Sequence, residues 1–256
     1  MNLQLTQHID VALLVLDAFF LFFLGLIIYL RREDRREGYP LEDNVSGAPE
    51  SYGSAFLMAP PKSFKLPFGH GTVTTPTKDR EPVAIAARRW DASPGSGLVP
   101  TGDPLVDGIG PAAYAQRAKR PDVDWEGHPR IVPISTAGDF TVERRDADPR
   151  GYAVVAADGR KAGVVTDLWI DKADRLIRYL EVEIDGGRRV LTPMFMASIS
   201  RSRSQVTVTA VTAAQFANVP AIEGSGVITL YEEERVQAYY GGGFLYATPE
   251  RAEPLI

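Results

Sequence analysis

A short acidic motif carries three side chains that could exchange protons. In "DVDWEGHPR", Asp124, Glu126 and His128 are spaced by two residues. Because Pro129 favours an extended backbone at His128, the three side chains could share one face. An imidazole among carboxylates takes up and releases protons near neutral pH. The motif predicts a proton-collecting or weakly metal-binding surface patch, and a solvated loop is the alternative.

A second group of charged residues surrounds a predicted turn. In "LWIDKADRLIRYLE", Asp171, Asp174 and Arg178 flank the turn between two apolar strands. Carboxylates held near a buried acceptor can hand protons on. The group predicts a proton relay, and a hydrophilic turn is again the alternative.

Other kinds of chemistry find little support in the sequence. Cysteine is absent and His8, His70 and His128 are the only histidines, so zinc ribbons, thiolate nucleophiles and multi-histidine metal centres are not expected. There is no G-x-S-x-G elbow, no dinucleotide fingerprint and no H-E-x-x-H motif, which disfavours an enzyme. The net charge is −5, and basic residues form no stripe outside one arginine cluster. Nucleic acid is therefore not an expected partner.

Residues 11–30 are apolar enough to cross a membrane. As a helix these 20 residues would extend about 30 Å, the thickness of a hydrocarbon core. Fifteen are Leu, Ile, Phe or Val, which favour insertion by about 4.5 to 9 kcal/mol, against about 2.5 to 3.5 kcal/mol for Asp17. A cleaved signal peptide is the alternative, but no basic residue precedes the run and no small-residue cleavage site follows it. We predict a retained helix. Asp10 and Asp17 share one face of it, either near the outer interface or toward other membrane helices.

Basic residues follow this segment immediately. Residues 1–30 contain no Lys or Arg, whereas Arg31, Arg32, Arg35 and Arg36 come directly after it. The positive-inside rule then places residues 1–10 outside and everything after residue 30 in the cytoplasm. The four arginines are expected at the membrane interface, among lipid headgroups.

Residues 31–150 are predicted to be extended or looped. Fifteen of the 19 prolines lie in this stretch, and proline breaks helices and central strands. Regularly spaced apolar residues such as Phe64, Trp90 and Leu105 are unlike a solvated linker. The segment is therefore expected to lie on a surface, either that of its own domain or that of a partner. One short helix is predicted over residues 111–119, with proline in its first turn.

Residues 151–256 have the pattern of a mainly β domain. Short alternating strands follow one another, joined by turns such as Asp158-Gly159, and this indicates a small antiparallel barrel or sandwich. In "LIRYLEVEI", Leu180, Val182 and Ile184 are predicted on one face and Tyr179, Glu181 and Glu183 on the other. "YEEERVQAYY" is predicted to form a short C-terminal helix that stops at the glycines of residues 241–243.

Several of these stretches, in this order, resemble one known family. The sequence is similar to the H subunit of the photosynthetic reaction centre of purple bacteria, and the resemblance runs over nearly the whole chain. The matching motifs are "YLRREDRREGYPL" (29–41), "PTGDPLVDGIGPAAYA" (100–115), "DLWID" (167–171), "RYLEVE" (178–183), "FANVP" (216–220) and "YYGGGFLYATPERAE" (239–253).

The resemblance implies a single-pass protein of the photosynthetic (intracytoplasmic or inner) membrane, with a periplasmic N-terminus. It implies a cytoplasmic domain built on a small β-barrel of the PRC-barrel kind. Such a subunit caps the L and M subunits, which hold bacteriochlorophyll, bacteriopheophytin, quinones and non-haem iron, and itself binds none of them. Light-harvesting antenna and membrane lipids are implied neighbours, and a cytochrome subunit is left open.

The resemblance also implies roles for individual residues. Asp174 matches the family's internal glutamate on the proton route to the secondary quinone, one methylene shorter, and Asp171 and Arg178 match neighbouring positions. Asp124 and His128 match the surface acid and histidine at the proton entrance. Glu126 replaces a histidine of some relatives, in which the trio can bind zinc. We therefore expect no metal site, and weak surface binding at Asp124 and His128 is the alternative.

Two function classes follow from the sequence. The first is a non-catalytic subunit of a light-driven electron-transfer complex that stabilises the complex and assists proton transfer. The alternative is a membrane-anchored β-barrel binding or adaptor module without a photosynthetic role. A single-pass enzyme is disfavoured by the missing motifs.

Overall fold

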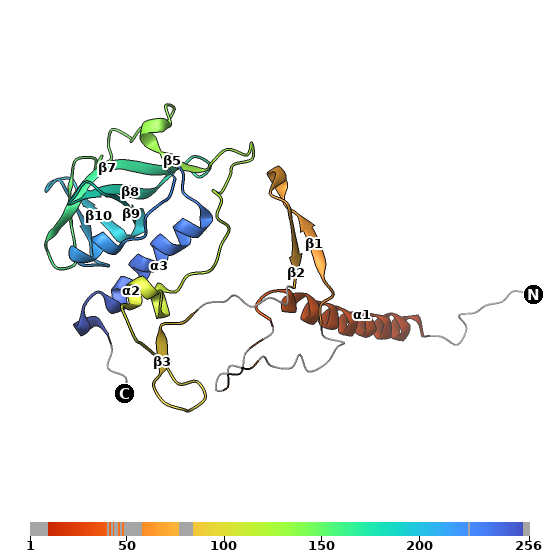
Figure 1. Ribbon diagram of the computed structural model, residues 1–256. Coiled ribbons are helices and arrows are strands. Elements are labelled where there is room, and N and C mark those ends of the chain that lie inside the picture. Colours follow the sequence, from red (N-terminus) through yellow and green to blue (C-terminus); the bar gives the residue numbers. More distant parts are fainter. Residues whose placement is uncertain are drawn as a thin grey trace, which may run out of the picture. The chain divides into compact units, whose positions relative to one another are not determined.

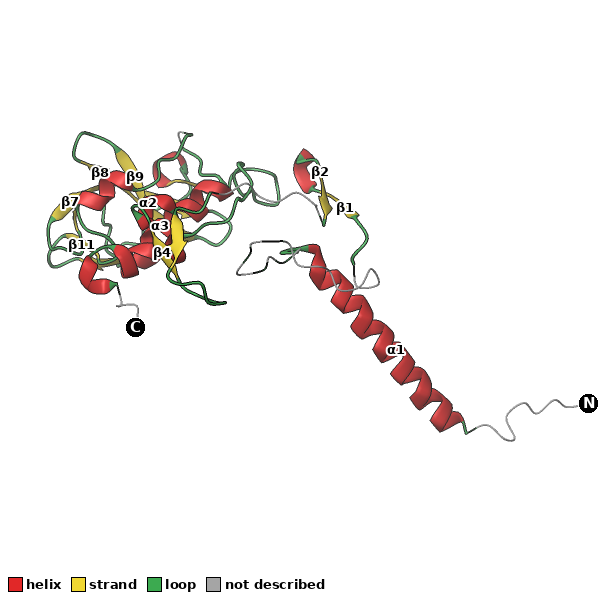
Figure 2. Ribbon diagram, turned by 60° about the horizontal axis from the view of Figure 1, so that its bottom comes forward, coloured by secondary structure: helices red, strands yellow, loops and turns green. Residues whose placement is uncertain are grey.

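The computed structural model describes residues 10–39, 41, 43, 46, 48, 58–76, 84–224 and 226–252. The chain divides into two compact units, Met1–Val83 with Asp91–Ser96, and Ala84–Trp90 with Gly97–Ile256. Figure 1 labels the main elements along the sequence, and Figure 2 distinguishes helices, strands and loops.

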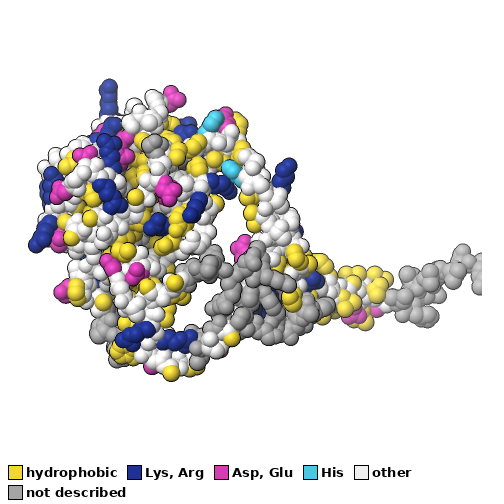
Figure 3. All heavy atoms as spheres, in the orientation of Figure 1, with side chains coloured by type: hydrophobic (Ala, Val, Ile, Leu, Met, Phe, Trp, Pro, Cys, Tyr) yellow, Lys and Arg dark blue, Asp and Glu magenta, His cyan; other side chains and the backbone are white. Residues whose placement is uncertain are grey.

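The first unit begins with one long apolar helix, α1 (Val11–Glu33), followed by the helical turn η1 (Asp34–Arg36). The Asp10 side chain caps α1, because its Oδ1 accepts the N–H groups of Ala12 (2.9 Å) and Leu13 (3.2 Å). The segment Val11–Arg36 is long and apolar enough to cross a membrane, and none of its most apolar part is buried in this chain. Hydrophobic side chains cover the visible side of α1 (Figure 3). The predicted apolar helix is confirmed.

A small hairpin belongs to the same unit. Strand β1 (Lys62–Lys65) pairs antiparallel with β2 (Thr72–Thr75), and η3 (Pro67–Gly69) connects them. The guanidinium of Arg36 joins this hairpin to the end of α1, because its Nη1 donates to the carbonyls of Pro60 (2.6 Å) and Thr75 (3.1 Å). The same side chain donates to Glu33 Oε2 at 2.7 Å.

The second unit opens with short elements separated by prolines and glycines. Strand β3 (Ala87–Arg89) pairs with β4 (Leu98–Pro100), and α2 (Pro104–Asp107) and η4 (Gly110–Ala112) follow. The helix predicted over residues 111–119 is wrong, because only η4 forms and residues 113–120 contain no helix. The carbonyls of Arg120 and Ala118 instead accept the N–H groups of Leu230 (3.0 Å) and Tyr231 (3.2 Å). These long-range bonds outweigh the local helix preference.

A curved seven-stranded sheet forms the body of the second unit. Its hydrogen-bonded order is β10-β11-β6-β7-β8-β9, and β5 pairs with β7. Among the described strands no ladder joins β9 to β10, so the barrel is not closed. The strands are β5 (Ile131–Pro133), β6 (Ala153–Val155), β7 (Lys161–Asp171), β8 (Leu176–Ile184), β9 (Arg189–Pro193), β10 (Ala197–Ser200) and β11 (Gln205–Val208); the turns are η5 (Ile134–Thr136), η6 (Met194–Met196), η7 (Ala214–Asn218) and η8 (Pro249–Arg251).

Strand β8 crosses the centre of the core and is covered on both faces. Leu180, Val182 and Ile184 are buried, and Tyr179 and Glu181 of the opposite set are buried as well. Of the second predicted set, Glu183 alone is exposed. The Glu181 carboxylate accepts hydrogen bonds from the Trp169 indole N–H at 3.0 Å, from Thr166 and from Arg189, both at 3.1 Å. A buried carboxylate is tolerated here because its oxygens are satisfied.

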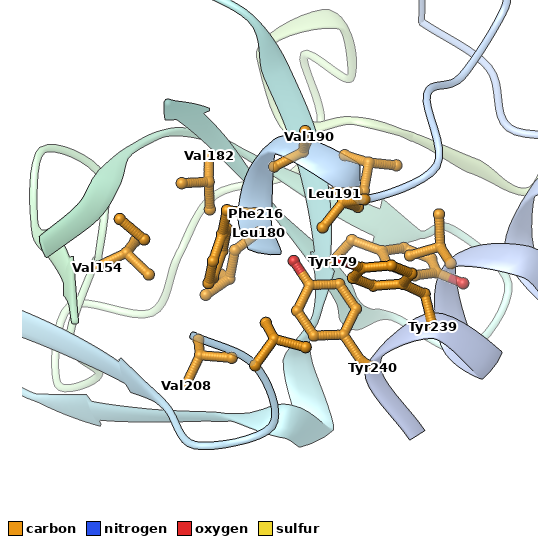
Figure 4. Packing of buried hydrophobic residues seen from close by; sticks show 14 of the residues in the cluster. Val154, Tyr179, Leu180, Val182, Val190, Leu191, Val208, Phe216, Tyr239 and Tyr240 are labelled. Carbon is orange, nitrogen blue, oxygen red and sulfur yellow. The ribbon is translucent and has the colours of Figure 1, made fainter. Parts of the chain in front are cut away.

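The C-terminal helix α3 (Leu230–Tyr246) packs against the sheet. Figure 4 shows Tyr239 and Tyr240 entering the core near Leu180 and Leu191. The helix continues through the glycines at which it was predicted to stop, so that boundary is wrong. A Cβ atom on Gly242 would lie 2.5 Å from Ala112 Cβ, and one on Gly243 would collide with the carbonyl of Ala210. These glycines permit close packing inside a helix.

Candidate functional site

One tight loop, residues 122–130, carries the first predicted charged group and lies next to the second. Val123 and Pro129 form an isolated antiparallel bridge, and the Asp124 N–H donates to the His128 carbonyl at 2.8 Å. The chain then enters β5, which pairs with β7 so that Ile131 lies opposite Asp171. The loop of residues 122–130 therefore connects the first acidic motif to the end of β7.

The first group, which we call the surface group, consists of Asp124, Glu126 and His128. His128 Nδ1 lies 3.5 Å from Glu126 Oε2 and 3.9 Å from Asp124 Oδ1. The side chains converge where the loop turns tightly, with the Gly127 N–H donating to the Asp124 carbonyl at 3.0 Å. The three side chains therefore lie close together, as predicted.

Hydrogen bonds keep the Asp124 carboxylate charged. Its Oδ1 accepts the backbone N–H groups of His128 (2.9 Å) and Glu126 (3.0 Å), and Oδ2 lies 3.6 Å from Lys172 Nζ. The bond from His128 is the largest cause that lowers the pKa of Asp124, and the bond from Glu126 and the charge of Lys172 add to it. The lowered pKa favours the anionic form of Asp124.

The donor set of the surface group fits a divalent cation only in part. One atom from each of the three side chains lies within 4.8 Å of the others. Glu126 and His128 are exposed, and protein metal sites of high affinity usually have a fourth donor and ordered supporting bonds. Weak surface binding remains a prediction.

Asp171 and Asp174, together with Arg130, form a second group, which we call the inner group. Arg130 binds both carboxylates. Its Nη2 donates to Asp171 Oδ2 at 2.7 Å and to Asp174 Oδ2 at 3.0 Å, and its Nη1 donates to Asp122 Oδ2 at 3.2 Å. The hydrogen bond with Asp171 is the largest cause that raises the pKa of Arg130. Asp171 is buried, whereas the Asp174 side chain is 52% exposed. One guanidinium thus joins a buried and an exposed carboxylate.

Backbone donors fix Asp171 further. Its Oδ1 accepts the N–H groups of Ala173 (3.0 Å) and Asp174 (3.2 Å). The turn closes at Arg175, which adopts a left-handed conformation with φ of 55°. The two predicted aspartates are therefore brought together by the β7–β8 turn and by Arg130.

Arg178 lies on a polar cleft beside the inner group. The cleft has a volume of about 210 Å³, enough for several waters, and Asp122, Arg130 and Asp171 also line it. Glu233 and Gln237 of α3 complete the opposite wall. The second predicted group therefore lies in one connected site. Asp171 and Arg178 line the cleft, and Asp174 is joined to it through its hydrogen bond with Arg130.

The sequence reasoning missed several residues of this site. Arg130 had one available signal, its place two residues after the first acidic motif. Glu233 belongs to an acidic run that indicated only a helix start, although the structure buries it beside Tyr179. The Tyr179 hydroxyl donates to Glu233 Oε2 at 2.9 Å, and Gln237 Nε2 donates to the Tyr179 oxygen at 2.9 Å. Burial is the main cause that raises the pKa of Glu233.

The four arginines predicted at a membrane interface have different local contacts. Arg31 lies 3.6 Å from Asp34, and Arg35 lies over the ring of Tyr39 at 5.5 Å. Arg32 is half-buried. The Arg36 side chain is 10% exposed and joins the end of α1 to the β1–β2 hairpin. Contact with lipid headgroups stays a prediction for all four.

Two sequence models of known families match the chain. The model of the photosynthetic reaction centre H-chain N-terminal region matches residues 3–136, which is 134 of the 256 residues. The model of the PRC-barrel domain matches residues 142–215, which contain strands β6 to β11. The two matches follow one another along the chain and include both the surface group and the inner group.

Proposed function

Because the chain belongs to the family of photosynthetic reaction-centre H chains, we propose that it is a non-catalytic subunit that caps the L and M subunits on their cytoplasmic face. In this role it stabilises the complex and assists proton transfer to the secondary quinone. The bacteriochlorophylls, bacteriopheophytins, quinones and non-haem iron belong to L and M. The sequence supports this division, because a chain with three histidines and no cysteine has few ligands for such groups.

The proposed location is the photosynthetic membrane, with α1 as a single anchor. Residues 1–10 lie in the periplasm, residues 11–30 in the bilayer, and the rest in the cytoplasm, in accord with the arginines that follow the helix. Residues 151–256 form most of the barrel domain, joined by β5 and by core residues such as Leu105, and the remainder of residues 31–150 lies over partner surfaces. Lipids and light-harvesting antenna surround the subunit, and a cytochrome subunit is a further neighbour where the complex has one.

The proposed proton route begins at the surface group. His128 and Glu126 exchange protons with the cytoplasm, and the anionic Asp124 raises the local proton concentration. Protons then reach the inner group, where Asp171 and Asp174 share the Arg130 guanidinium. The observation that carries this proposal is that one loop, residues 122–130, holds the surface group at its tip and Arg130 at its base.

Asp174 is the acid of the inner group that is accessible to a partner. Its carboxylate is half-exposed, and its only described cationic contact is Arg130 at 3.0 Å. Solvent and a partner surface can therefore reach this carboxylate. In the proposed route Asp174 delivers the proton toward the secondary quinone.

The substitution Asp174→Asn tests the proton role. We expect a slower second, proton-coupled reduction of the secondary quinone, with primary charge separation unchanged, because the amide cannot carry the proton. Flash-induced absorption kinetics across a pH series measure both steps. Asp185→Asn is the matched control, since it changes another exposed turn aspartate outside the site. Kinetics of Asp174→Asn that equal those of the control at every pH would exclude Asp174 from the route.

A further inference from the structure

The β1–β2 hairpin has two chemically different faces, and both are largely exposed. Because successive strand residues point to opposite sides, Phe64 and its cross-strand partner Val73 share one face with Lys62. Phe64 and Val73 are 43% and 44% exposed, and Lys62 Nζ lies 5.5 Å from the centre of the Phe64 ring. The other face is polar, since the hydroxyl groups of Ser63 and Thr74 bond to each other at 2.8 Å. We call Lys62, Phe64 and Val73 the exposed hairpin face.

Three contacts tie the base of the hairpin to the end of α1. Arg36 donates to the carbonyls of Pro60, which precedes β1, and of Thr75, which ends β2. Lys62 Nζ lies 4.0 Å from Oε2 of Glu33, the last residue of α1. Because Lys62 belongs to the exposed hairpin face, this face is turned toward the end of α1 at its base.

With residues 11–30 in the bilayer, as proposed, the hairpin base lies close to the lipid headgroups. Arg36 comes six residues after residue 30, which corresponds to about 9 Å along a helix. The headgroup layer extends about 5 to 8 Å beyond the hydrocarbon core on each side. The exposed hairpin face therefore begins at the outer edge of this layer, from where an extended lysine side chain reaches lipid phosphates.

The charge of the hairpin complements an anionic surface. Residues 58–76 contain Lys62 and Lys65 but no Asp or Glu. Among the described residues no carboxylate pairs with Lys65, and Lys62 reaches Glu33 only at the outer limit of an ion pair. The Arg36 guanidinium already binds Glu33 at 2.7 Å, so both lysines remain available. A face that combines lysine with apolar side chains is typical of segments that lie on anionic membranes.

We propose that the exposed hairpin face binds the surface of a bilayer that contains anionic phospholipids. Phe64 and Val73 lie among the headgroups, and Lys62 and Lys65 lie beside lipid phosphates. Because α1 holds the hairpin base at the membrane surface, the contact needs no second protein chain. A protein seated on this face is the competing occupant. The inference rests on the membrane anchor of the proposed function and not on its proton route.

Spin labels in the full chain test the proposal, because a chain without cysteine takes a label only where a cysteine is introduced. Val73→Cys places the label on the exposed hairpin face, and Thr72→Cys places it on the other face. In nanodiscs of phosphatidylglycerol and phosphatidylcholine, we expect the label at position 73 to be shielded from a water-soluble nickel complex and the label at position 72 to be accessible. In phosphatidylcholine alone, or in about 1 M salt, the shielding should weaken severalfold. Shielding that is absent in anionic discs, or equal in both kinds of disc, overturns the proposal.

Charge variants test the role of the two lysines. Lys62→Gln/Lys65→Gln should lower the ratio of bound to free hairpin roughly 25-fold, about fivefold for each lysine. Lys62→Arg/Lys65→Arg keeps the charge and should keep the shielding, which separates lost charge from a damaged hairpin. Lys161→Gln removes an exposed lysine of the second unit and should change nothing. Unchanged shielding in the glutamine variant contradicts the proposal.

A protein occupant would give a different result. If shielding at position 73 appears only after L and M subunits are added, a protein covers the exposed hairpin face and the proposal is wrong. The nanodiscs otherwise contain no pigment, quinone or second subunit. Their result is therefore independent of the flash kinetics of Asp174→Asn, which test the proposed function.

Discussion

At the scale of single residues, Arg130 decides the chemistry of the site. Its guanidinium offsets the cost of burying the Asp171 carboxylate, and it also binds the Asp174 carboxylate. Asp171 has two further backbone donors, so part of its stabilisation does not depend on Arg130. Arg130 is thus paired with three carboxylates in one ion network.

Removing Arg130 should destabilise the second unit. For Arg130→Met we expect a loss of about 2 kcal/mol, below the roughly 3 to 5 kcal/mol of a fully buried pair, because solvent reaches the guanidinium. Chemical unfolding of the full chain in detergent measures the change. The double variant Arg130→Met/Asp171→Asn should recover much of the loss, since no charge is then left buried. Equal losses in the single and double variants would contradict this explanation.

The stability of the loop should depend on pH through Asp124. The folded protein lowers the pKa of Asp124, so its charged form stabilises the fold above the ordinary pKa of 3.8, and this contribution is lost as pH falls through the lowered value. Asp124→Asn should therefore lower the Tm at neutral pH and differ less from wild type in acid. Thermal unfolding followed by circular dichroism at several pH values measures the difference. A constant difference at every pH would show that charge is not the cause.

At the scale of elements, α3 depends on its small residues. Gly242 and Gly243 lie against Ala112 and the backbone of Ala210, whereas a Cβ on Gly241 would lie 3.6 Å from the Pro111 carbonyl, an ordinary contact. The three consecutive glycines therefore have different roles. The first is tolerated in the helix, and the other two allow close packing.

Alanine substitutions separate these roles. Gly241→Ala should stabilise the protein by about 0.5 to 1 kcal/mol, because alanine is the better helix former. Gly243→Ala should destabilise it by about 1 to 3 kcal/mol, because backbone must move to admit the methyl group. Chemical unfolding of both variants under identical conditions gives the comparison. If both substitutions stabilise, α3 does not pack as described.

The loop of residues 122–130 is the element that connects the site. Its base is held by β5, which pairs with β7, and by the Lys172 N–H, which donates to the Arg130 carbonyl at 2.9 Å. Its tip is held by Asp124, which binds two backbone N–H groups of the loop. Hydrogen bonds therefore hold the loop at both its base and its tip.

At the scale of the whole molecule, partner contact is the central expectation. The hairpin β1–β2 is exposed nearly throughout, including Phe64 (43%) and Val73 (44%), and α1 buries none of its residues in this chain. Isolated two-stranded hairpins are only marginally stable in water. A membrane and partner chains would cover these surfaces.

Purification from native membranes distinguishes the two functions. In a mild detergent we expect the chain to co-purify with L and M subunits in equal amounts, with the near-infrared absorption of their pigments. The alternative, a membrane-anchored binding or adaptor module, predicts a pigment-free preparation without these chains. Antibody capture of an unrelated single-pass protein from the same extract controls for co-solubilised membrane. Pigment-free chain in every preparation would favour the alternative.

The sequence alone determined the elements whose signals are local. Residues 11–30 are apolar without interruption except at Asp17 and Gly25, so the helix could be predicted from composition. Alternating residues in β8 and the Asp158-Gly159 turn predicted the strands for the same reason. The surface group was also found, because a tight turn joins residues that are close in sequence.

Only the tertiary structure decided the remaining features, because they depend on residues far apart in the chain. Arg130 meets Asp171, 41 positions later, through the β5–β7 ladder, and Tyr179 meets Glu233 only after α3 packs on the sheet. The non-helical course of residues 113–120 and the continuation of α3 through its glycines have the same origin. In each case a long-range hydrogen bond or a close packing contact outweighs the local preference of the backbone that the sequence pattern indicates.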